Sequence, residues 1–216
     1  FKLPQIDLYS VKEIYYTLQG EGYHTGRPSI FLRFSGCNLW TGLENDREKA
    51  LCYWCDTDFV GTDGANGGKY TARQILEIIL KLWPKSIDSK PYIVFTGGEP
   101  LLQVDKKIIS TLHDVGFEIG LETNGTIAPP DGIDWICVSP KANTKLILRE
   151  GNELKLVYPQ KDINPKDHEH LKFDHFYIQP LDNSNKDSNV IESKKFVKLN
   201  PLWKLSMQFH KVLGIP

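Results

Sequence analysis

Hydrophobic residues occur along this chain in short runs that end at glycine, proline, acidic or amide residues. Runs that are rich in β-branched and aromatic residues are typical of strands. Within residues 29–35, Ile30, Leu32 and Phe34 fall on one face of the expected strand and Arg33 on the other. Strands are predicted at residues 11–18, 29–35, 92–96, 118–123, 135–139, 153–157, 175–179 and 204–208.

Hydrophobic residues at helical spacing predict helices between several of these strands. Thr71 and Gln74 form the pattern of a capping box, and Pro84 ends the helix that follows. Residues 61–68 are too rich in glycine for a regular element and predict a loop. Further helices are expected at residues 44–51, 101–115, 165–172 and 189–199.

The alternation of strands and helices favours a parallel sheet with right-handed crossovers. With 216 residues the chain is near the lower size of a full eight-unit barrel, and several connections are too short for a helix. We therefore predict an α/β fold, an incomplete or modified (β/α) barrel with a mostly parallel sheet. A single domain is expected over residues 1–216, with a long insertion at residues 38–51.

Composition excludes some classes of function. The chain has 26 Lys and Arg residues against 27 Asp and Glu, which argues against a large basic surface for nucleic acid. No apolar run approaches the roughly 20 residues of a membrane span. Residues 1–10 lack the basic and apolar regions of a signal peptide. We expect a cytoplasmic protein that binds neither nucleic acid nor membrane.

Three of the four cysteines lie close together in the sequence. Cys37, Cys52 and Cys55 have the spacing C-x14-C-x2-C, and their thiolates could converge on one metal or cluster. Three ligands leave one coordination position open for chemistry, whereas closed four-ligand sites are usually structural. The alternative is a zinc site with Cys137 or a histidine as fourth ligand. Cys137 lies in the apolar run WICVS and is interpreted as a core cysteine.

Polar residues follow the ends of most predicted strands. In a parallel sheet these ends share one edge, which is where ligands bind in barrels and open α/β sheets. We therefore expect one site there, formed by Gln19, Glu21, Cys37, residues 96–99, 122–124, 139–141 and 179–182, and His210.

The cysteines and TGGEP at residues 96–100 resemble the radical S-adenosylmethionine (SAM) enzymes. Their usual cluster motif is C-x3-C-x2-C, so the first gap of 14 departs from it. Six further segments resemble the 7-carboxy-7-deazaguanine synthase family, some of whose members have this long gap. They are YTLQGEG (16–22), RFSGCNLW (33–40), CDTDFVGTDG (55–64), ETNG (122–125), CVSPK (137–141) and MQFHKVLGIP (207–216). The resemblance extends from about residue 11 to residue 216.

The resemblance implies a fold of the radical SAM type and a carbon–nitrogen lyase. The reaction converts 6-carboxy-5,6,7,8-tetrahydropterin to 7-carboxy-7-deazaguanine with release of ammonia, in queuosine and deazapurine biosynthesis. Cys37, Cys52 and Cys55 would hold a [4Fe-4S] cluster whose fourth iron binds SAM. SAM would be used catalytically to generate a 5′-deoxyadenosyl radical. An electron donor such as a flavodoxin or ferredoxin, a homodimer, and Mg²⁺ at Thr57 are also implied.

The same resemblance assigns ligand-binding residues. The implied SAM site consists of Trp54, Cys55, Asp56, Gly98, Glu99, Glu122, Asn124, Ser139, Pro140, Lys141, Gln179, Pro180, Leu181 and Asp182. The implied substrate site consists of Leu18, Gln19, Gly20, Glu21, Arg33, Thr96, His210 and the C-terminal carboxylate of Pro216. The residue that transfers the proton stays open, with Glu21 and His210 as candidates by residue type alone.

Structural alternatives stand beside these assignments. TGGEP could be only a tight turn, Thr57 a turn residue, and residues 179–182 the start of a loop. Arg33 could form a surface ion pair, and His210 could be a surface histidine. For the whole chain, the alternatives are an activase that installs a glycyl radical on a partner protein and a non-enzymatic zinc-binding module. Measurement of the zinc, iron and sulfide content of the protein distinguishes the zinc-binding module from the ring-contracting enzyme and from the activase.

Overall fold

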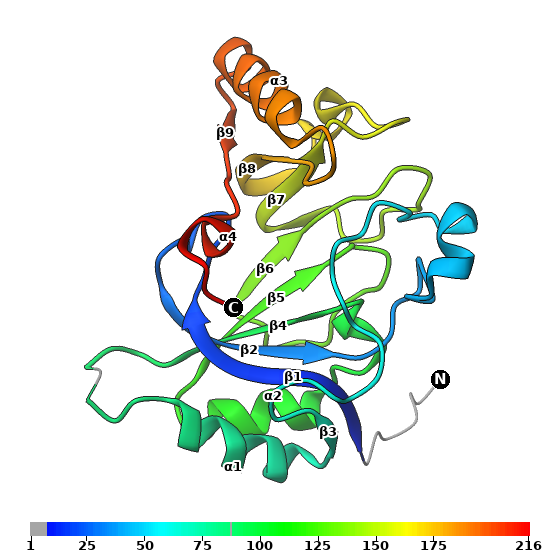
Figure 1. Cartoon of the computed structure of the whole chain (residues 1–216). Helices are drawn as coiled ribbons and strands as arrows, with labels where there is room; N and C mark the ends of the chain where they lie inside the picture. The colour runs from blue at the N-terminus through cyan, green and yellow to red at the C-terminus, as the bar shows by residue number, and fades with distance from the viewer. Residues whose placement is uncertain (1–7, 87) are drawn as a thin grey trace.

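The strands of the described residues, 8–86 and 88–216 of a computed structural model, form one curved sheet (Figure 1). The sheet has nine strands in the order β3-β1-β2-β4-β5-β6-β7-β8-β9. Their bounds are β1 Tyr9–Leu18, β2 Pro28–Phe34, β3 Gly68–Tyr70, β4 Tyr92–Gly97, β5 Glu118–Thr123, β6 Trp135–Val138, β7 Glu150–Tyr158, β8 Lys172–Pro180 and β9 Trp203–Leu205. Residues 1–7, on which most of the signal-peptide expectation rests, lie outside the described residues.

From β2 onward, neighbouring strands are parallel, whereas β1 is antiparallel to both β2 and β3. Within the described part of the chain, β3 and β9 are the two edges of the sheet and do not pair with each other. The predicted fold class, an incomplete barrel with a mostly parallel sheet, is therefore confirmed.

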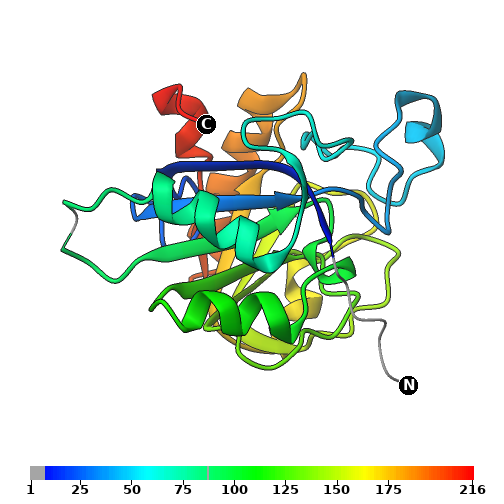
Figure 2. The ribbon, with the colours of Figure 1, turned by 90° about the horizontal axis from the view of Figure 1, so that it is seen from below.

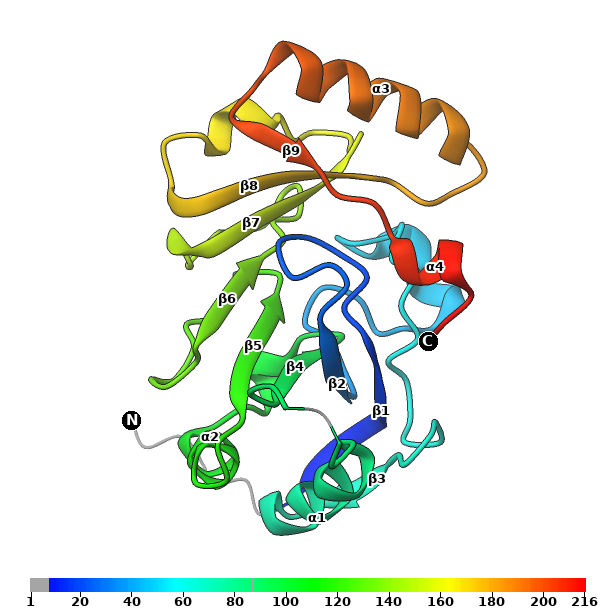
Figure 3. The same ribbon diagram turned by 90° about the vertical axis from the view of Figure 1, so that its left-hand side faces the viewer.

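The longer helices cover the outer face of the sheet. They are α1 Ala72–Leu82, α2 Lys106–His113 and α3 Lys186–Leu199, with a short α4 at Phe209–Leu213. Figure 2 and Figure 3 show α1 and α2 side by side against one half of the sheet and α3 over β8 and β9. α1 begins at Thr71 with the predicted capping box. No helix in the described ranges combines the length and apolar character that crossing a membrane requires.

The side chains that face these helices form the hydrophobic core. Ile30, Leu32 and Phe34 of β2 are fully buried against the helices, as their alternation predicts. A second cluster under α3 includes Leu154 and Trp203. Because the apolar residues of each strand face outward to the helices, the polar residues between them face the interior of the barrel.

Several predicted elements differ in the structure. The helix predicted at 101–115 is split into a 3₁₀ turn, Pro100–Leu102, and α2. The break arises because the Asp105 side chain caps α2, while Gln103 hydrogen-bonds to the backbone of Ser10. The segments at 44–51 and 165–172 form only short 3₁₀ helices, Glu44–Lys49 and Pro165–His168. The last strand ends at Leu205, and α4 and β3 were not predicted.

The segment after β9 spans the gap between the two sides of the sheet. The Phe209 N–H donates to the Gly20 carbonyl at 2.9 Å. The Thr17 hydroxyl donates to a Pro216 oxygen at 2.8 Å, across 199 positions of sequence. Figure 3 shows α4 between β9 and β1, with the C-terminus beside β1. The incomplete barrel is therefore closed by this segment and not by strand pairing.

Candidate active site

A cavity of about 470 Å³ lies inside the barrel. It is bordered by β1, β2, the cysteine loop, the C-terminal ends of β4, β5, β6 and β8, and the segment after β9. Most of the residues singled out in the sequence line it: Leu18, Gln19, Gly20, Glu21, Arg33, Cys37, Cys52, Trp54, Cys55, Asp56, Thr57, Thr96, Gly98, Glu122, Asn124, Ser139, Lys141, Gln179, His210 and Pro216.

The three clustered cysteines converge on this cavity as free thiols. A hydrogen bond from the Cys52 thiol, helped by the Thr57 N–H and opposed by burial, lowers the pKa of Cys55 to about 6. Burial raises the pKa of Cys37. Cys137 is 4% exposed and does not border the cavity, which fits its interpretation as a core residue.

This donor set fits a cluster better than a single metal ion. Within residues 8–86 and 88–216, no group of three or more His, Cys, Asp or Glu side chains is close enough to hold one ion. A zinc ion needs its ligands around one centre, whereas each iron of a [4Fe-4S] cluster takes its own protein sulfur. Cys37, Cys52 and Cys55 around one cavity therefore suit the larger group.

The 38–51 insertion holds the cysteine loop from the outside. Arg47 Nη1 donates to the carbonyls of Tyr53 at 2.8 Å and Cys55 at 3.0 Å. The same guanidinium lies 4.1 Å from the ring centroid of Trp40, which packs edge-on against Phe59. Arg47 thus fixes the turn that carries Cys52 and Cys55.

The glycines of TGGEP allow the end of β4 to pack against the cysteine loop. A Cβ on Gly98 would lie 2.2 Å from the Gly36 carbonyl oxygen and 2.7 Å from Cys37 Cβ. Gly97 has φ 140°, a conformation that favours glycine. Protein packing at the end of β4 therefore requires glycine at both positions.

Five residues expected at the SAM site do not line the cavity: Glu99, Pro140, Pro180, Leu181 and Asp182. Glu99 is fully buried, and its carboxylate accepts hydrogen bonds from the Leu101 and Asn124 N–H groups and the Thr123 hydroxyl. It therefore anchors the loop after β5. Asp182 pairs with Lys186 and Lys211.

A lysine that the sequence interpretation missed lies at the centre of the polar wall. Lys155 Nζ of β7 is 2.6 Å from Glu21 Oε2 and 3.3 Å from Glu122 Oε2, and its side chain is 4% exposed. Burial opposes ionisation of Glu21, but the Lys155 charge and a hydrogen bond from Gln208 lower its pKa to about 2. The surrounding carboxylates outweigh burial and raise the pKa of Lys155. A lysine within the apolar strand ELKLV was the available signal.

Arg33 forms a half-buried ion pair next to this wall. Its Nε donates to Glu13 Oε1 at 2.8 Å, and Nη2 donates to the Tyr15 hydroxyl at 3.2 Å. Both partners line the cavity, and the Arg33 side chain is 17% exposed. The surface-pair alternative for Arg33 therefore does not describe its position.

Gln19 and Glu21 reach the cavity from an unexpected direction. Because β1 is antiparallel to β2, its end at Leu18 pairs with Pro28, where β2 begins. Residues 19–27 then fold inward across the opposite end of the barrel, where the Tyr23 ring stacks on His175 at 4.3 Å. The expectation that all these polar residues share one edge is wrong for Gln19 and Glu21.

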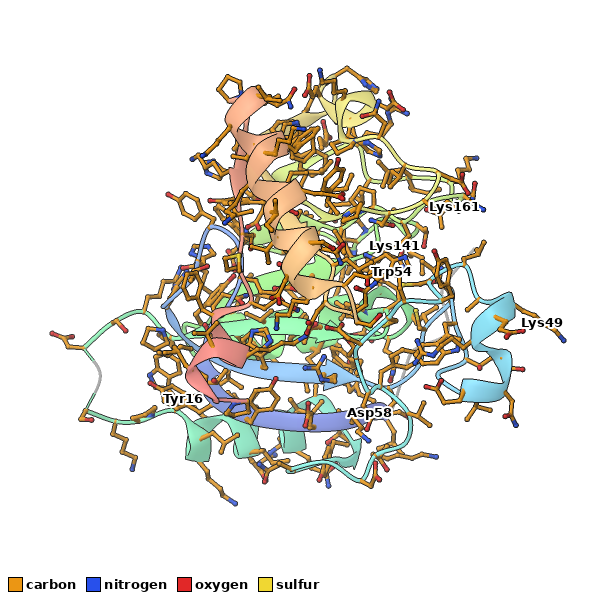
Figure 4. The ribbon with its side chains drawn as sticks, turned by 45° about the horizontal axis from the view of Figure 1, so that its top comes forward. Tyr16, Lys49, Trp54, Asp58, Lys141 and Lys161 are labelled. Atoms are coloured by element: carbon orange, nitrogen blue, oxygen red, sulfur yellow. The ribbon has the colours of Figure 1, made fainter. Side chains whose placement is uncertain are left out.

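The side chains of Trp54 and Lys141 meet on the cavity wall, as Figure 4 shows. Lys141 Nζ lies 5.4 Å from the Trp54 ring centroid and donates to the Ser139 hydroxyl at 2.7 Å. Burial lowers the pKa of Lys141, although the thiolates of Cys52 and Cys55 would oppose this. His210 of α4 packs against Gly20, where a Cβ would lie 2.4 Å from the imidazole Nδ1.

The chain is similar in sequence and in fold to known enzymes. No family model matches the chain. It is 56% identical over 208 residues to a 7-carboxy-7-deazaguanine synthase of Bradyrhizobium diazoefficiens, covering 96% of this chain and 99% of the relative. It is 50% identical over 209 residues to the Bordetella pertussis enzyme of the same name, with the same coverage. The crystal structure of QueE from Escherichia coli superposes with a TM-score of 0.69 at 26% identity, covering 93% of this chain and 94% of that one.

Proposed function

Since this chain belongs to the 7-carboxy-7-deazaguanine synthase family of radical SAM lyases, we propose that its cavity binds and converts 6-carboxy-5,6,7,8-tetrahydropterin. The product would be 7-carboxy-7-deazaguanine, formed by ring contraction with release of ammonia. The observation that supports this most is that three free cysteines and the Glu21–Lys155–Glu122 group line one cavity. The three cysteines suit a redox cluster, and the group of Glu21, Lys155 and Glu122 suits a small molecule rich in hydrogen-bond donors.

We propose that Cys37, Cys52 and Cys55 hold the [4Fe-4S] cluster and that the neighbouring wall binds SAM. When bound, the cluster and SAM supply the removal of a hydrogen atom from the substrate carbon that bears the carboxylate. Trp54 offers an aromatic face, while Lys141 and Ser139 offer donors on the same wall. Asp56, Gly98, Asn124 and Gln179 complete this wall.

The substrate would lie between the polar wall and Arg33. Glu21 and Glu122 are acceptors for the pterin N–H groups, because Lys155 keeps Glu21 ionised. The guanidinium of Arg33, already aligned by Glu13 and Tyr15, suits a carboxylate or carbonyl. Leu18, Gln19, Gly20, Thr96, His210 and Pro216 enclose the remaining sides.

Mg²⁺ would be bound at Thr57, which borders the cavity directly after Cys55 and Asp56. One hydroxyl oxygen is a poor ligand set alone, but magnesium keeps several waters and takes further oxygen ligands from its substrate. The substrate carboxylate would supply a second oxygen. This arrangement would fix the carboxylate relative to the carbon that reacts.

Two interactions of the folded chain are also proposed. An electron donor such as a flavodoxin or ferredoxin would dock at the cysteine loop, where Leu51 and Tyr53 are each 48% exposed. A homodimer would cover exposed hydrophobic residues such as Ile191, Leu199 and Val212. Reduction of the cluster would take place in the cytoplasm.

The test is anaerobic reconstitution with iron and sulfide, followed by incubation with SAM, reductant, Mg²⁺ and the carboxypterin. Formation of 7-carboxy-7-deazaguanine with one ammonia per product, and without net consumption of SAM, is expected. Stoichiometric consumption of SAM would instead favour an activase that acts on a partner protein. A single zinc per chain without iron or sulfide would reject the proposal.

A further inference from the structure

A second, much smaller chamber lies behind the polar wall of the catalytic cavity. Its volume of about 10 Å³ is close to what one water molecule requires. Gln19, Glu21 and Glu122 line both the chamber and the cavity, so these three side chains form the partition between them. On its far side the chamber is bordered by His24 and Glu153.

Two buried polar atoms face this space without a partner. Among the described residues, His24 Nε2 and Glu153 Oε1 are buried atoms with no hydrogen-bond partner. Glu153 is 3% exposed, and its other oxygen accepts from the Tyr23 N–H at 3.2 Å. Buried polar groups are almost always paired with protein or with ordered water. A water between the two atoms would satisfy both.

The backbone around the chamber is shaped to keep this space small. Gly22 has φ +67°, and a Cβ there would lie 1.9 Å from Glu153 Oε1. The Gly22 N–H donates to the Ser206 hydroxyl at 2.9 Å. Gly22 therefore lets residues 19–27 lie directly against Glu153, which leaves room for one small molecule and no more.

The two groups that face the chamber are suited to exchange a proton. Burial raises the pKa of Glu153, and the Lys155 charge, the Tyr23 N–H and the Trp135 side chain oppose this only in part. Burial and the nearby Arg27 charge lower the pKa of His24, so its imidazole is neutral at neutral pH. A carboxyl that takes up a proton readily thus faces a neutral imidazole that can hold the bridging water.

We propose that one buried water bridges His24 and Glu153 and that this bridged pair stores a proton for the catalytic cavity. This inference rests on the proposed function, in which the substrate loses ammonia and no net proton is gained or lost. A proton that leaves the ring carbon must return to the departing nitrogen. Glu122 takes up this proton and passes a proton to the water, and the water passes a proton to Glu153 Oε1. The same route in reverse returns a proton to the departing nitrogen.

The structural arm of the test is a high-resolution crystal structure of the wild-type protein. It should show one water within hydrogen-bond distance of both His24 Nε2 and Glu153 Oε1. Infrared difference spectroscopy should show a protonated carboxyl band that Glu153→Gln removes. Glu150→Gln is the matched control, because Glu150 lies on the same strand as Glu153 and pairs with Lys172 outside the chamber. A dry chamber, or a band unaffected by Glu153→Gln, would overturn the proposal.

The kinetic arm uses the reconstituted holoenzyme. Glu153→Gln keeps the side-chain shape and the Tyr23 contact but cannot store a proton. Its kcat should fall by about 100-fold with unchanged KM, while Glu153→Asp should recover part of that loss. A wild-type kcat in Glu153→Gln, or an equal loss in Glu150→Gln, would contradict a proton store. If the wild type forms no product, the proposed function fails, whereas the water and the infrared band still decide whether the chamber holds a proton.

Discussion

Lys155 Nζ lies 2.6 Å from Glu21 Oε2, which joins the middle of β7 to the loop that enters from the other end of the barrel. Glu122 is the second carboxylate on the same ammonium. The three residues come from β7, the loop after β1, and β5, so the ion pairs tie together segments far apart in sequence. The Lys155 charge keeps the Glu21 carboxylate ionised, although burial opposes its charge.

Lys155→Met should weaken both the fold and substrate binding. Loss of one partner leaves buried carboxylates without a cation, so the free energy of unfolding should fall by about 3 kcal/mol. Denaturant titration measures this, with Lys155→Arg as the control that keeps the positive charge. A variant as stable as the wild type would show that the two carboxylates do not need the ammonium.

The same substitution should change the pH dependence. In the wild type the folded-state pKa of Glu21 is about 2, below the ordinary value of 4.5. Its stabilising contribution is therefore complete above about pH 4.5 and is lost as the pH falls towards 2. Without Lys155 the two carboxylates repel each other, so the acidic limb of kcat/KM should move to higher pH. An unchanged profile would exclude Glu21 as an ionised acceptor.

Cys55→Ala should abolish both cluster absorbance and turnover, because Cys55 is one of three thiols that line the cavity. Cys137→Ala is the matched control. Cys137 is buried in β6 outside the cavity, so that variant should still bind iron and sulfide. Full activity in Cys55→Ala, or loss of the cluster in Cys137→Ala, would contradict the assignment of the ligands.

Gly98→Ala should impair cluster binding without removing any ligand. The new methyl group would meet the Gly36 carbonyl and Cys37 Cβ, which forces the cysteine loop away from β4 at a cost of about 2 kcal/mol. Gly116→Ala provides the comparison. Its φ is +87° but nothing lies near its Cβ position, so it should lower stability and leave iron content intact. Equal iron content in the two variants would refute this account of Gly98.

Arg47→Ala should loosen the turn that carries Cys52 and Cys55. Removing its hydrogen bonds to the Tyr53 and Cys55 carbonyls should weaken retention of iron against a chelator by about tenfold. Arg73→Ala removes an equally charged side chain from an exposed pair with Glu77 and should have no effect. The same release rate in both variants would mean that the insertion does not support the cluster loop.

Features governed by local pattern could be predicted from the sequence. The alternation around Arg33 gave the correct face of β2, and Thr71 with Gln74 gave the start of α1. Features governed by the tertiary pairing of distant segments could not be predicted from the sequence. The direction of β1 depends on its antiparallel contact with β2, so the route of Gln19 and Glu21 into the barrel was missed. The hydrogen bonds of Glu99 to Thr123 and Asn124 could not be predicted either, because they form only once β5 lies beside β4.

The segment that closes the barrel also has a consequence for biosynthesis. Because α4 and Pro216 pack on Gly20 and Thr17, strands made early are covered only by a segment made about 199 positions later in the chain. During translation, before this segment is made, the charged interior of the incomplete barrel would be open to solvent on one side. Emergence of residues 209–216 from the ribosome, and not the pairing of the first strands, would therefore be the moment at which the reaction chamber becomes sealed.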